Sequence, residues 1–226
     1  MKKGLLSFAV NFVLVGVIVL LYLITALPYT DAVPTLGTAV YKGSEDSKVA
    51  LQWVVSWSAK SLDEILNILK DSNVKVTFIV SGEWVNNNQA MLIRMVAEGH
   101  EIGTCGMHPN QDGNLSWVSA DVIEAIGVIE ESGGVSPRLY YSGNRKQSVS
   151  SRASRQLGLT HVVCTLDLLC SRGNADDIME RLDNVTGGSI VLMQPTTQAA
   201  EALSDLIAEL KGRGLTPVPT GELIGI

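Results

Sequence analysis

The sequence predicts an α/β fold in which short buried strands alternate with amphipathic helices. Three observations indicate it: apolar runs of strand length recur from residue 49 onward, segments with helical spacing lie between them, and glycines follow several helical segments. Such alternation is typical of a parallel sheet covered by helices. An α/β barrel and a doubly wound open sheet both fit the pattern, and in both of them ligands bind at the carboxyl ends of the strands.

Each predicted element follows from a local pattern. The first helix shows the reasoning, because Leu62, Ile65 and Leu69 share one helical face and Ser61 with Glu64 has the spacing of an N-terminal capping box. The strands are expected at residues 49–53, 74–80, 101–103, 138–141, 161–166, 189–193 and 216–218. The helices are expected at residues 61–70, 88–98, 119–131, 149–157, 175–182 and 198–211. Glycines supply left-handed helix ends at Gly99, Gly133, Gly158 and Gly212.

The N-terminal region predicts a membrane anchor. Residues 4–27 form an apolar run without a charged residue, and Lys2 and Lys3 precede it. A helix of about 24 residues can cross a hydrocarbon core of about 30 Å, and the flanking lysines favour a cytoplasmic N-terminus. We therefore expect a cytoplasmic stub and transmembrane anchor at residues 1–27, with the folded domain outside the cytoplasm. A cleaved signal peptide is the alternative, but its apolar region is usually shorter and ends in a small-x-small site.

The remaining chain is expected to form a linker and one domain. Residues 28–47 contain Pro28, Pro34, Gly37 and Gly43 without an apolar period, which indicates a linker, and the domain is expected at residues 48–226. The net charge of −6 argues against a nucleic-acid partner, because such proteins normally carry a basic surface.

Several segments carry a resemblance to a known family. They are Val76 to Trp84, the Ala-Glu-Gly-His-Glu-Ile-Gly stretch at 97–103, Leu-Gly-Leu at 157–159, Gly-Ser-Ile-Val-Leu-Met at 188–193 and Leu-Thr-Pro-Val at 215–218. In this order and spacing, over roughly residues 48–224, the chain resembles the polysaccharide deacetylases (NodB homology domain, carbohydrate esterase family 4). The resemblance implies a distorted (β/α) barrel of about seven strands. It also implies a divalent metal that activates water to hydrolyse the N-acetyl group of a glycan.

The catalytic positions that the resemblance implies hold unsuitable residues. The family's Thr-Phe-Asp-Asp-Gly motif falls on residues 52–56, so that Val54 and Val55 replace the base and the metal-binding aspartate. The Leu-x-His motif falls on residues 192–194, where Gln194 replaces the acid histidine. Valine has no lone pair or proton to offer, and glutamine does not titrate near neutral pH. The family's acid/base chemistry is therefore expected to be lost.

The family's histidine motif leaves a possible residual site. His108 matches its second histidine, while Cys105, or Thr104 if the gap lies elsewhere, replaces the first. Cys-x-x-His spacing can bind zinc through thiolate and imidazole. Two ligands make a weak site, so a residual histidine beside a buried thiol is the favoured interpretation and no metal or other cofactor is expected. If a metal binds, His108 and Cys105 are its expected ligands.

The remaining motifs add three residues to the possible residual site. Arg138 matches the arginine of the third motif and is expected to tie down a loop or cap a carboxylate. Asp167 and Cys170 fall on the fourth motif, Asp-x-x-Asp-Trp, in which only Asp167 is kept, and it is expected to accept backbone hydrogen bonds in a turn. Cys105 and Cys170 both follow strands, so a disulfide between them or a thiol site with His108 is one hypothesis, and three unrelated thiols is the other.

Aromatic residues are expected near the same groove. Trp53, Tyr140 and Tyr141 either stack on sugar rings or fill the space that a metal site vacates. Together these features predict a membrane-anchored pseudoenzyme of a bacterial envelope that binds a cell-wall glycan or an envelope protein. Two alternatives stay open at this point: an active metal-dependent glycan N-deacetylase with rearranged ligands, and a structural envelope scaffold.

Overall fold

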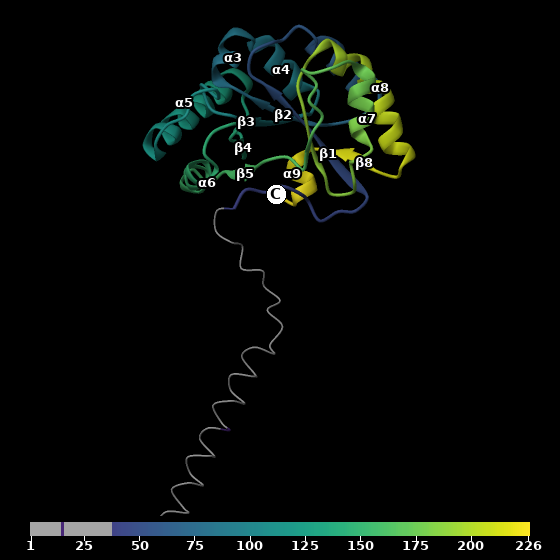
Figure 1. Cartoon of the computed structure of the whole chain (residues 1–226). Helices are drawn as coiled ribbons and strands as arrows, with labels where there is room; N and C mark the ends of the chain where they lie inside the picture. Colours follow the sequence, from purple (N-terminus) through teal and green to yellow (C-terminus); the bar gives the residue numbers. More distant parts are fainter. Residues whose placement is uncertain (1–14, 16–37) are drawn as a thin grey trace, which may run out of the picture. The chain divides into compact units, whose positions relative to one another are not determined.

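The computed structural model describes residue 15 and residues 38–226. The expected anchor and most of the expected linker lie outside the described residues. Among the residues that are described, no helix combines the length and the apolar character needed to cross a bilayer. The chain divides into two units, residues 1–36 and residues 37–226, and the second unit is the α/β domain (Figure 1).

The domain is built on one parallel sheet, as the alternating pattern predicts. Its strands are β1 (Lys48–Val55), β2 (Thr77–Val80), β3 (Glu101–Thr104), β4 (Leu139–Tyr141), β5 (Thr160–Val162), β6 (Leu166–Asp167), β7 (Ile190–Met193) and β8 (Thr216–Val218). The order is β5-β4-β3-β2-β1-β7-β6, and β8 pairs with β1. β7 pairs with residues 50–53 of β1, whereas β8 pairs with residues 48–50 and β2 with residues 52–55. β8 and β2 therefore lie end to end along the edge of β1 opposite β7.

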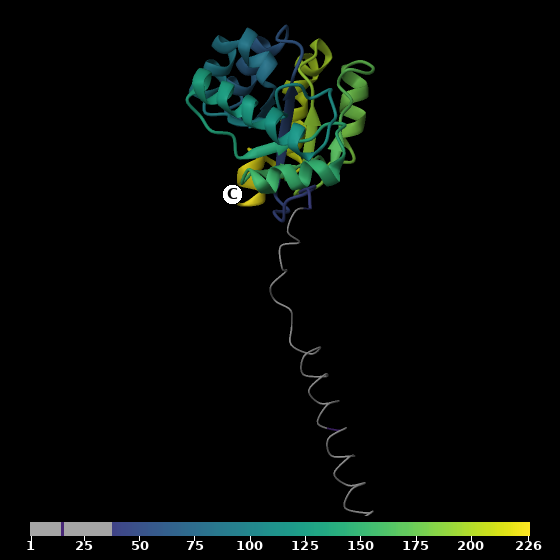
Figure 2. The same ribbon diagram turned by 90° about the vertical axis from the view of Figure 1, so that its left-hand side faces the viewer.

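The helices from α2 to α8 cover the outer face of the sheet, as the two views show (Figure 1 and Figure 2). They are α2 (Leu62–Asp71), α3 (Gly82–Asn87), α4 (Gln89–Ala97), α5 (Leu115–Gly133), α6 (Gln147–Gln156), α7 (Ala175–Leu182) and α8 (Thr197–Gly212). The short helix α9 (Thr220–Ile224) lies apart from them, and its Leu223 packs with Ala50, Ile190 and Val218. The capping box expected at Ser61 does not form, because Ser61 has a φ of −103° and a ψ of 1° and its side chain makes no cap bond. Asn114 and Asn174, in extended conformation, do cap their helices.

The sheet has eight strands because the apolar run at residues 161–166 is divided. Only residues 163–165 connect β5 to β6, although these strands lie at opposite ends of the sheet order. Four Cα–Cα steps of 3.8 Å bring the two edges within about 15 Å of each other, so the sheet must curl strongly. Val40 sits at this junction: its N–H donates to the carbonyl oxygen of His161, and its own carbonyl oxygen accepts from Val163.

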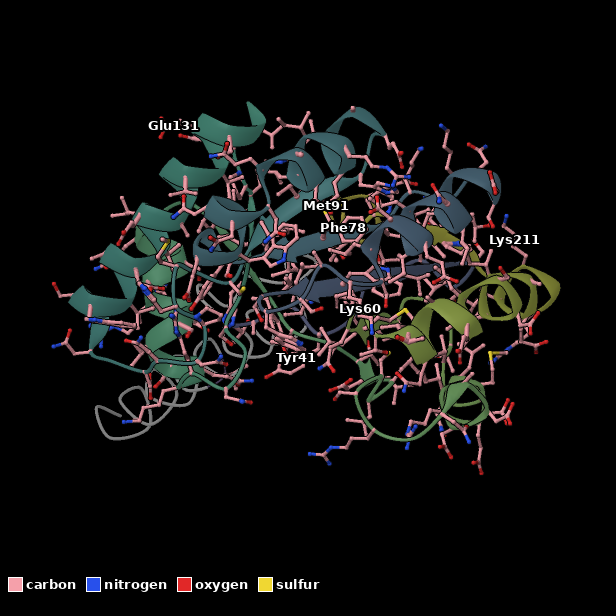
Figure 3. All side chains as sticks on the ribbon, turned by 90° about the horizontal axis from the view of Figure 1, so that it is seen from above. Tyr41, Lys60, Phe78, Met91, Glu131 and Lys211 are labelled. Atoms are coloured by element: carbon pink, nitrogen blue, oxygen red, sulfur yellow. The ribbon has the colours of Figure 1, made fainter. Side chains whose placement is uncertain are left out.

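The curl separates two apolar layers. An outer core between sheet and helices contains Trp53, Val55 and Phe78, and the labelled Phe78 lies deep within the domain in Figure 3. Inside the curl lies an inner cluster, which we define as Val54, Ile79, Cys105, Leu139, Val162 and Leu192. Consecutive residues of β1 therefore point to opposite layers, as the period of a strand requires.

One polar side chain lies fully buried on β1. Gln52 is 0% exposed, and neither its amide nitrogen nor its amide oxygen has a hydrogen-bond partner in the protein. A buried polar group without a partner costs about 1–3 kcal/mol. Gln52 is thus a local source of instability in the middle of the sheet.

We predict that Gln52→Met raises the free energy of unfolding by about 1–3 kcal/mol, because methionine keeps the length of the side chain and removes its unpaired polar atoms. Urea titration followed by circular dichroism measures the change. Gln89→Met, at an exposed position of α4, is the matched control and should change stability by less than about 0.5 kcal/mol. A Gln52→Met variant less stable than the parent would contradict this account.

Candidate functional site

A pocket of about 160 Å³ lies at the carboxyl ends of the strands. It is lined by the residues that follow or end β1, β3, β4, β6 and β7, which is where the topology predicts a ligand site. The lining residues are Val54, Ser56, Trp57, Cys105, Pro109, Asn110, Tyr141, Gly143, Asn144, Asp167, Leu192 and Gln194.

Five of the residues that the sequence singled out meet in this pocket. Val54 reaches it from β1, Cys105 follows β3, Tyr141 ends β4, Asp167 ends β6 and Gln194 follows β7. They converge because the strands are parallel and the sheet curls, so that alternate side chains of each strand point inward. Val54, Cys105 and Gln194, which the resemblance assigns to the family's base, first histidine and acid, are therefore neighbours in space.

Three other expected site residues on the strands point away from the pocket. Val55 and Trp53 are fully buried in the outer core, and Tyr140 packs under α5 and α6 with Val118, Val122 and Ala153. The hydroxyl of Tyr140 accepts a hydrogen bond of 3.3 Å from Arg145. Neither Trp53 nor Tyr140 is thus a groove aromatic, because the alternation of side chains turns both of them to the helix side.

The remaining expected residues also lie elsewhere. Nδ1 of His108 lies 3.2 Å from Oδ1 of Asp121, in a separate hollow. Arg138 donates to the main-chain oxygen of Ile226 at 3.3 Å and so ties down the end of the chain. Cys170 is buried in the outer core.

All three cysteines are free thiols in the structure. Cys105 belongs to the inner cluster and Cys170 to the outer core, so the hypothesis of a Cys105–Cys170 disulfide receives no support from their placement. The third cysteine, Cys164, is half-buried, lies between β5 and β6, and packs against the inner cluster. Burial raises the pKa of the Cys105 thiol to about 12, which keeps it protonated and a poor nucleophile near neutral pH.

The polar groups of the pocket can form hydrogen bonds but offer little acid/base chemistry. Asp167 accepts a 2.8 Å bond from the N–H of Leu169, in the kind of turn that the sequence predicted. The buried amide oxygen of Gln194 has no partner in the protein. Burial raises the pKa of the Tyr141 phenol, so that it remains protonated. Asp167 is the one carboxylate among the described lining residues.

The residues of the pocket do not fit the divalent metal that the fold family implies. Within the described part of the chain, no three His, Cys, Asp or Glu side chains come close enough to share a metal ion. The potential ligand pair is divided, because Cys105 lines the pocket while His108 is held by Asp121 in the neighbouring hollow. We therefore derive no chemical step through a metal.

Sequence reasoning did not find the buried ion pair behind the pocket. Arg145 and Asp121, 3% and 5% exposed, are joined by a 2.7 Å salt bridge. Asp121 also accepts from the N–H groups of Met107 and His108, while Arg145 donates to the carbonyl oxygens of His108 and Gln111. The pair thus fixes the loop at residues 105–111, which contributes Cys105, Pro109 and Asn110 to the pocket.

A glycine permits this arrangement. Gly106 has a φ of +88°, and a Cβ atom there would collide with Oδ2 of Asp121. No local motif indicates an ion pair between residues 24 positions apart. The sequence offers one signal: residues 132–166 contain no Asp or Glu, so a buried Arg145 needs a carboxylate partner from a distant segment.

Comparison with known proteins gives one matching family. The model of the polysaccharide deacetylase family matches residues 42–162, which is more than half of the chain. The chain is 32% identical over 183 residues to the uncharacterised protein YlxY of Bacillus subtilis, covering 77% of this chain and 57% of YlxY. It is 27% identical over 207 residues to the peptidoglycan-N-acetylglucosamine deacetylase PgdA of Listeria monocytogenes, covering 88% of this chain and 42% of PgdA. The chain thus spans less than two thirds of either relative.

A solved structure is similar over most of the chain. It is wild-type BA3943, a CE4 family pseudoenzyme of Bacillus anthracis, with a TM-score of 0.78 and 27% identity, covering 83% of this chain and 69% of that one. A BA3943 mutant, reported as the pseudoenzyme with restored enzymatic activity, also superposes with a TM-score of 0.78.

We predict that Arg145→Met lowers the free energy of unfolding by about 3–5 kcal/mol, because it leaves the buried Asp121 carboxylate without its charged partner. Lys48→Met is the matched control. Lys48 pairs with Glu222, but their side chains are 32% and 52% exposed, so the loss should be no more than about 1 kcal/mol. Urea titration of both variants measures the difference, and equal losses would show that the buried pair has no special role.

Proposed function

The chain belongs to the polysaccharide deacetylase family, and from that premise we propose that it is a pseudoenzyme whose pocket binds a cell-wall glycan outside the cytoplasmic membrane. In this proposal the pocket lies where the family has its active site, and its residues bind a ligand but carry out no acid/base or metal chemistry. Residues 4–27 anchor the chain in the membrane, with the domain on the extracytoplasmic side.

One observation carries the proposal: Val54, Cys105 and Gln194 line the same pocket, at the family positions of a base, a metal-binding histidine and an acid. Each replacement removes a function that a metal-dependent deacetylase needs, because valine accepts no proton, a single thiol without neighbouring ligands holds no metal ion, and an amide transfers no proton near neutral pH. The likeness to a CE4 family pseudoenzyme agrees with this interpretation.

The polar groups that remain suit an N-acetylated sugar. The amides of Asn110, Asn144 and Gln194 can donate to and accept from hydroxyl and acetamido groups, and Asp167 can accept from a hydroxyl. Trp57, which is 58% exposed at the pocket, presents an aromatic face on which a sugar ring can stack. The name of PgdA, a peptidoglycan-N-acetylglucosamine deacetylase, supports the choice of peptidoglycan as the glycan.

The alternative of an active hydrolase with rearranged ligands has less support. It needs His108, Asp167 and the cysteines to surround one metal ion, and these side chains lie in different places. A scaffolding role needs no pocket, so it does not account for the polar groups that converge there.

We predict that the full chain in detergent binds oligomers of N-acetylglucosamine and releases no acetate from them. Trp57→Ala should weaken binding about three- to tenfold, which corresponds to the loss of an aromatic contact worth about 0.5–1.5 kcal/mol. Isothermal titration calorimetry measures the affinity and an enzymatic acetate assay tests for turnover.

Ile93→Ala is the control, because Ile93 is comparably exposed, at 53%, and lies on α4 outside the pocket. Binding that is indifferent to Trp57 would contradict the proposed glycan pocket. Release of acetate by the parent chain would contradict the pseudoenzyme interpretation and leave the binding site in place.

A further inference from the structure

A long segment of this acidic protein contains no acidic residue. Between Glu131 and Asp167 the chain has no Asp or Glu, while the net charge of the whole is −6. The segment carries five cationic residues: Arg138, Arg145, Lys146, Arg152 and Arg155. It comprises β4, α6 and β5, which form one edge of the sheet and the helix that covers it.

Three of these cations are free to meet a partner outside the domain. Arg145 is buried against Asp121, and Arg138 binds the main chain of Ile226. Lys146, Arg152 and Arg155 are exposed on or next to α6, and none of the ion pairs within residues 38–226 involves them. Arg152 and Arg155 lie three residues apart on α6 and line one hollow, and we call these two residues the cationic face of α6.

A hollow of about 310 Å³ lies on this face. Besides Arg152 and Arg155 its lining includes the exposed amide of Gln147 and the exposed hydroxyl of Ser148, which can donate hydrogen bonds to a phosphate, and it contains no carboxylate. The other lining residues are Thr38, Ala39, Tyr41, Gln147, Ser148 and Ser151. It shares no residue with the glycan pocket.

The described chain begins beside this helix, as Figure 1 and Figure 2 both show. The hydroxyl of Tyr41 donates to Oε1 of Gln147, at the first turn of α6, with a distance of 2.8 Å. Tyr41 is 47% exposed, and tyrosine is enriched at membrane interfaces because its ring is apolar and its hydroxyl is polar. The entry point of the chain and the cationic face are therefore adjacent.

Covalent geometry limits how far this face can lie from the anchor. Residues 28–37 separate the apolar run from Thr38, and ten residues span at most about 36 Å. Thr38, which lines the hollow together with Arg152 and Arg155, is therefore joined to the apolar run by a short stretch of sequence. An exposed cationic helix face complements the negative charge of anionic phospholipids once it comes within a Debye length of about 8 Å.

We propose that the cationic face of α6 docks on the anionic phospholipid headgroups of the membrane in which the chain is anchored. The inference rests on the anchoring included in the proposed function, and it adds a second binding surface that fixes the orientation of the domain. Each cation near an anionic surface favours the docked state about fivefold. The exposed hydroxyl of Ser148 in the hollow can donate a further hydrogen bond to lipid phosphate.

The test uses the full chain with Cys164→Ser, reconstituted into vesicles of phosphatidylcholine alone or with phosphatidylglycerol as the anionic lipid. A fluorescent dye at Gln156→Cys, an exposed position at the end of α6 outside the hollow, reports proximity to spin-labelled lipid by quenching. The same dye at Glu131→Cys, at the outer end of α5 in Figure 3, is the positional control. Quenching at residue 156 should exceed that at residue 131 only with phosphatidylglycerol, and it should vanish near 1 M salt, where the Debye length is about 3 Å.

Charge variants make the test specific. Arg152→Gln with Arg155→Gln should lower the ratio of docked to undocked chains about 25-fold, from two cations at about fivefold each. Lys60→Gln with Lys70→Gln removes the same charge from exposed positions on and before α2 and should have little effect. Quenching that is equal in both vesicles, or that responds to the lysine pair instead of the arginine pair, would overturn the proposed docking.

Flotation of the same vesicles separates the two proposals. If the chain floats with both kinds of vesicle but quenching is the same in both, the docking is contradicted and the membrane anchor is not. A chain that floats with neither contradicts the anchor and the docking together.

Discussion

The short connection between β5 and β6 is the constraint on which the pocket depends. These strands lie at opposite ends of the sheet order, and three residues join them, so the sheet has to curl until its edges approach. Curling turns alternate side chains of β1, β3, β4, β6 and β7 toward one another. Val54, Cys105, Tyr141, Asp167 and Gln194 come together for that reason, although they span 140 positions of the sequence, from 54 to 194.

A second interaction shapes the same pocket from behind. Arg145 and Asp121 bind the main chain of the loop at residues 105–111, and Asp121 holds the ring of His108 outside the pocket. The pocket therefore keeps its walls while a potential metal ligand is directed elsewhere. What remains is an arrangement of amides, one carboxylate and an exposed tryptophan, which is suited to recognising a polar ligand and not to activating water.

Much of the fold followed from the sequence, and the reasons for the exceptions are physical. Periodicity located the strands, but it could not show that the run at residues 161–166 divides, because the division comes from pairing of Val163 with Val40 and of Thr165 with Ile190. The family motifs located Val54, Cys105 and Gln194, which do meet in the pocket. The motifs could not place His108, because its ring is held by Asp121, which pairs with Arg145 from a distant segment. They could not place Trp53 or Tyr140 either, because the direction of each depends on the face of the strand that it occupies.

The metal content of the full chain, purified without chelator and without a histidine tag, tests the central claim most directly. Elemental analysis after dialysis against zinc should find far less than one zinc ion per chain, because Cys105 and His108 lie apart and no cluster of three potential ligands forms among the described residues. One tightly bound zinc ion per chain that is lost in both Cys105→Ser and His108→Ala would contradict the account, since it would require the two side chains to meet at a metal site.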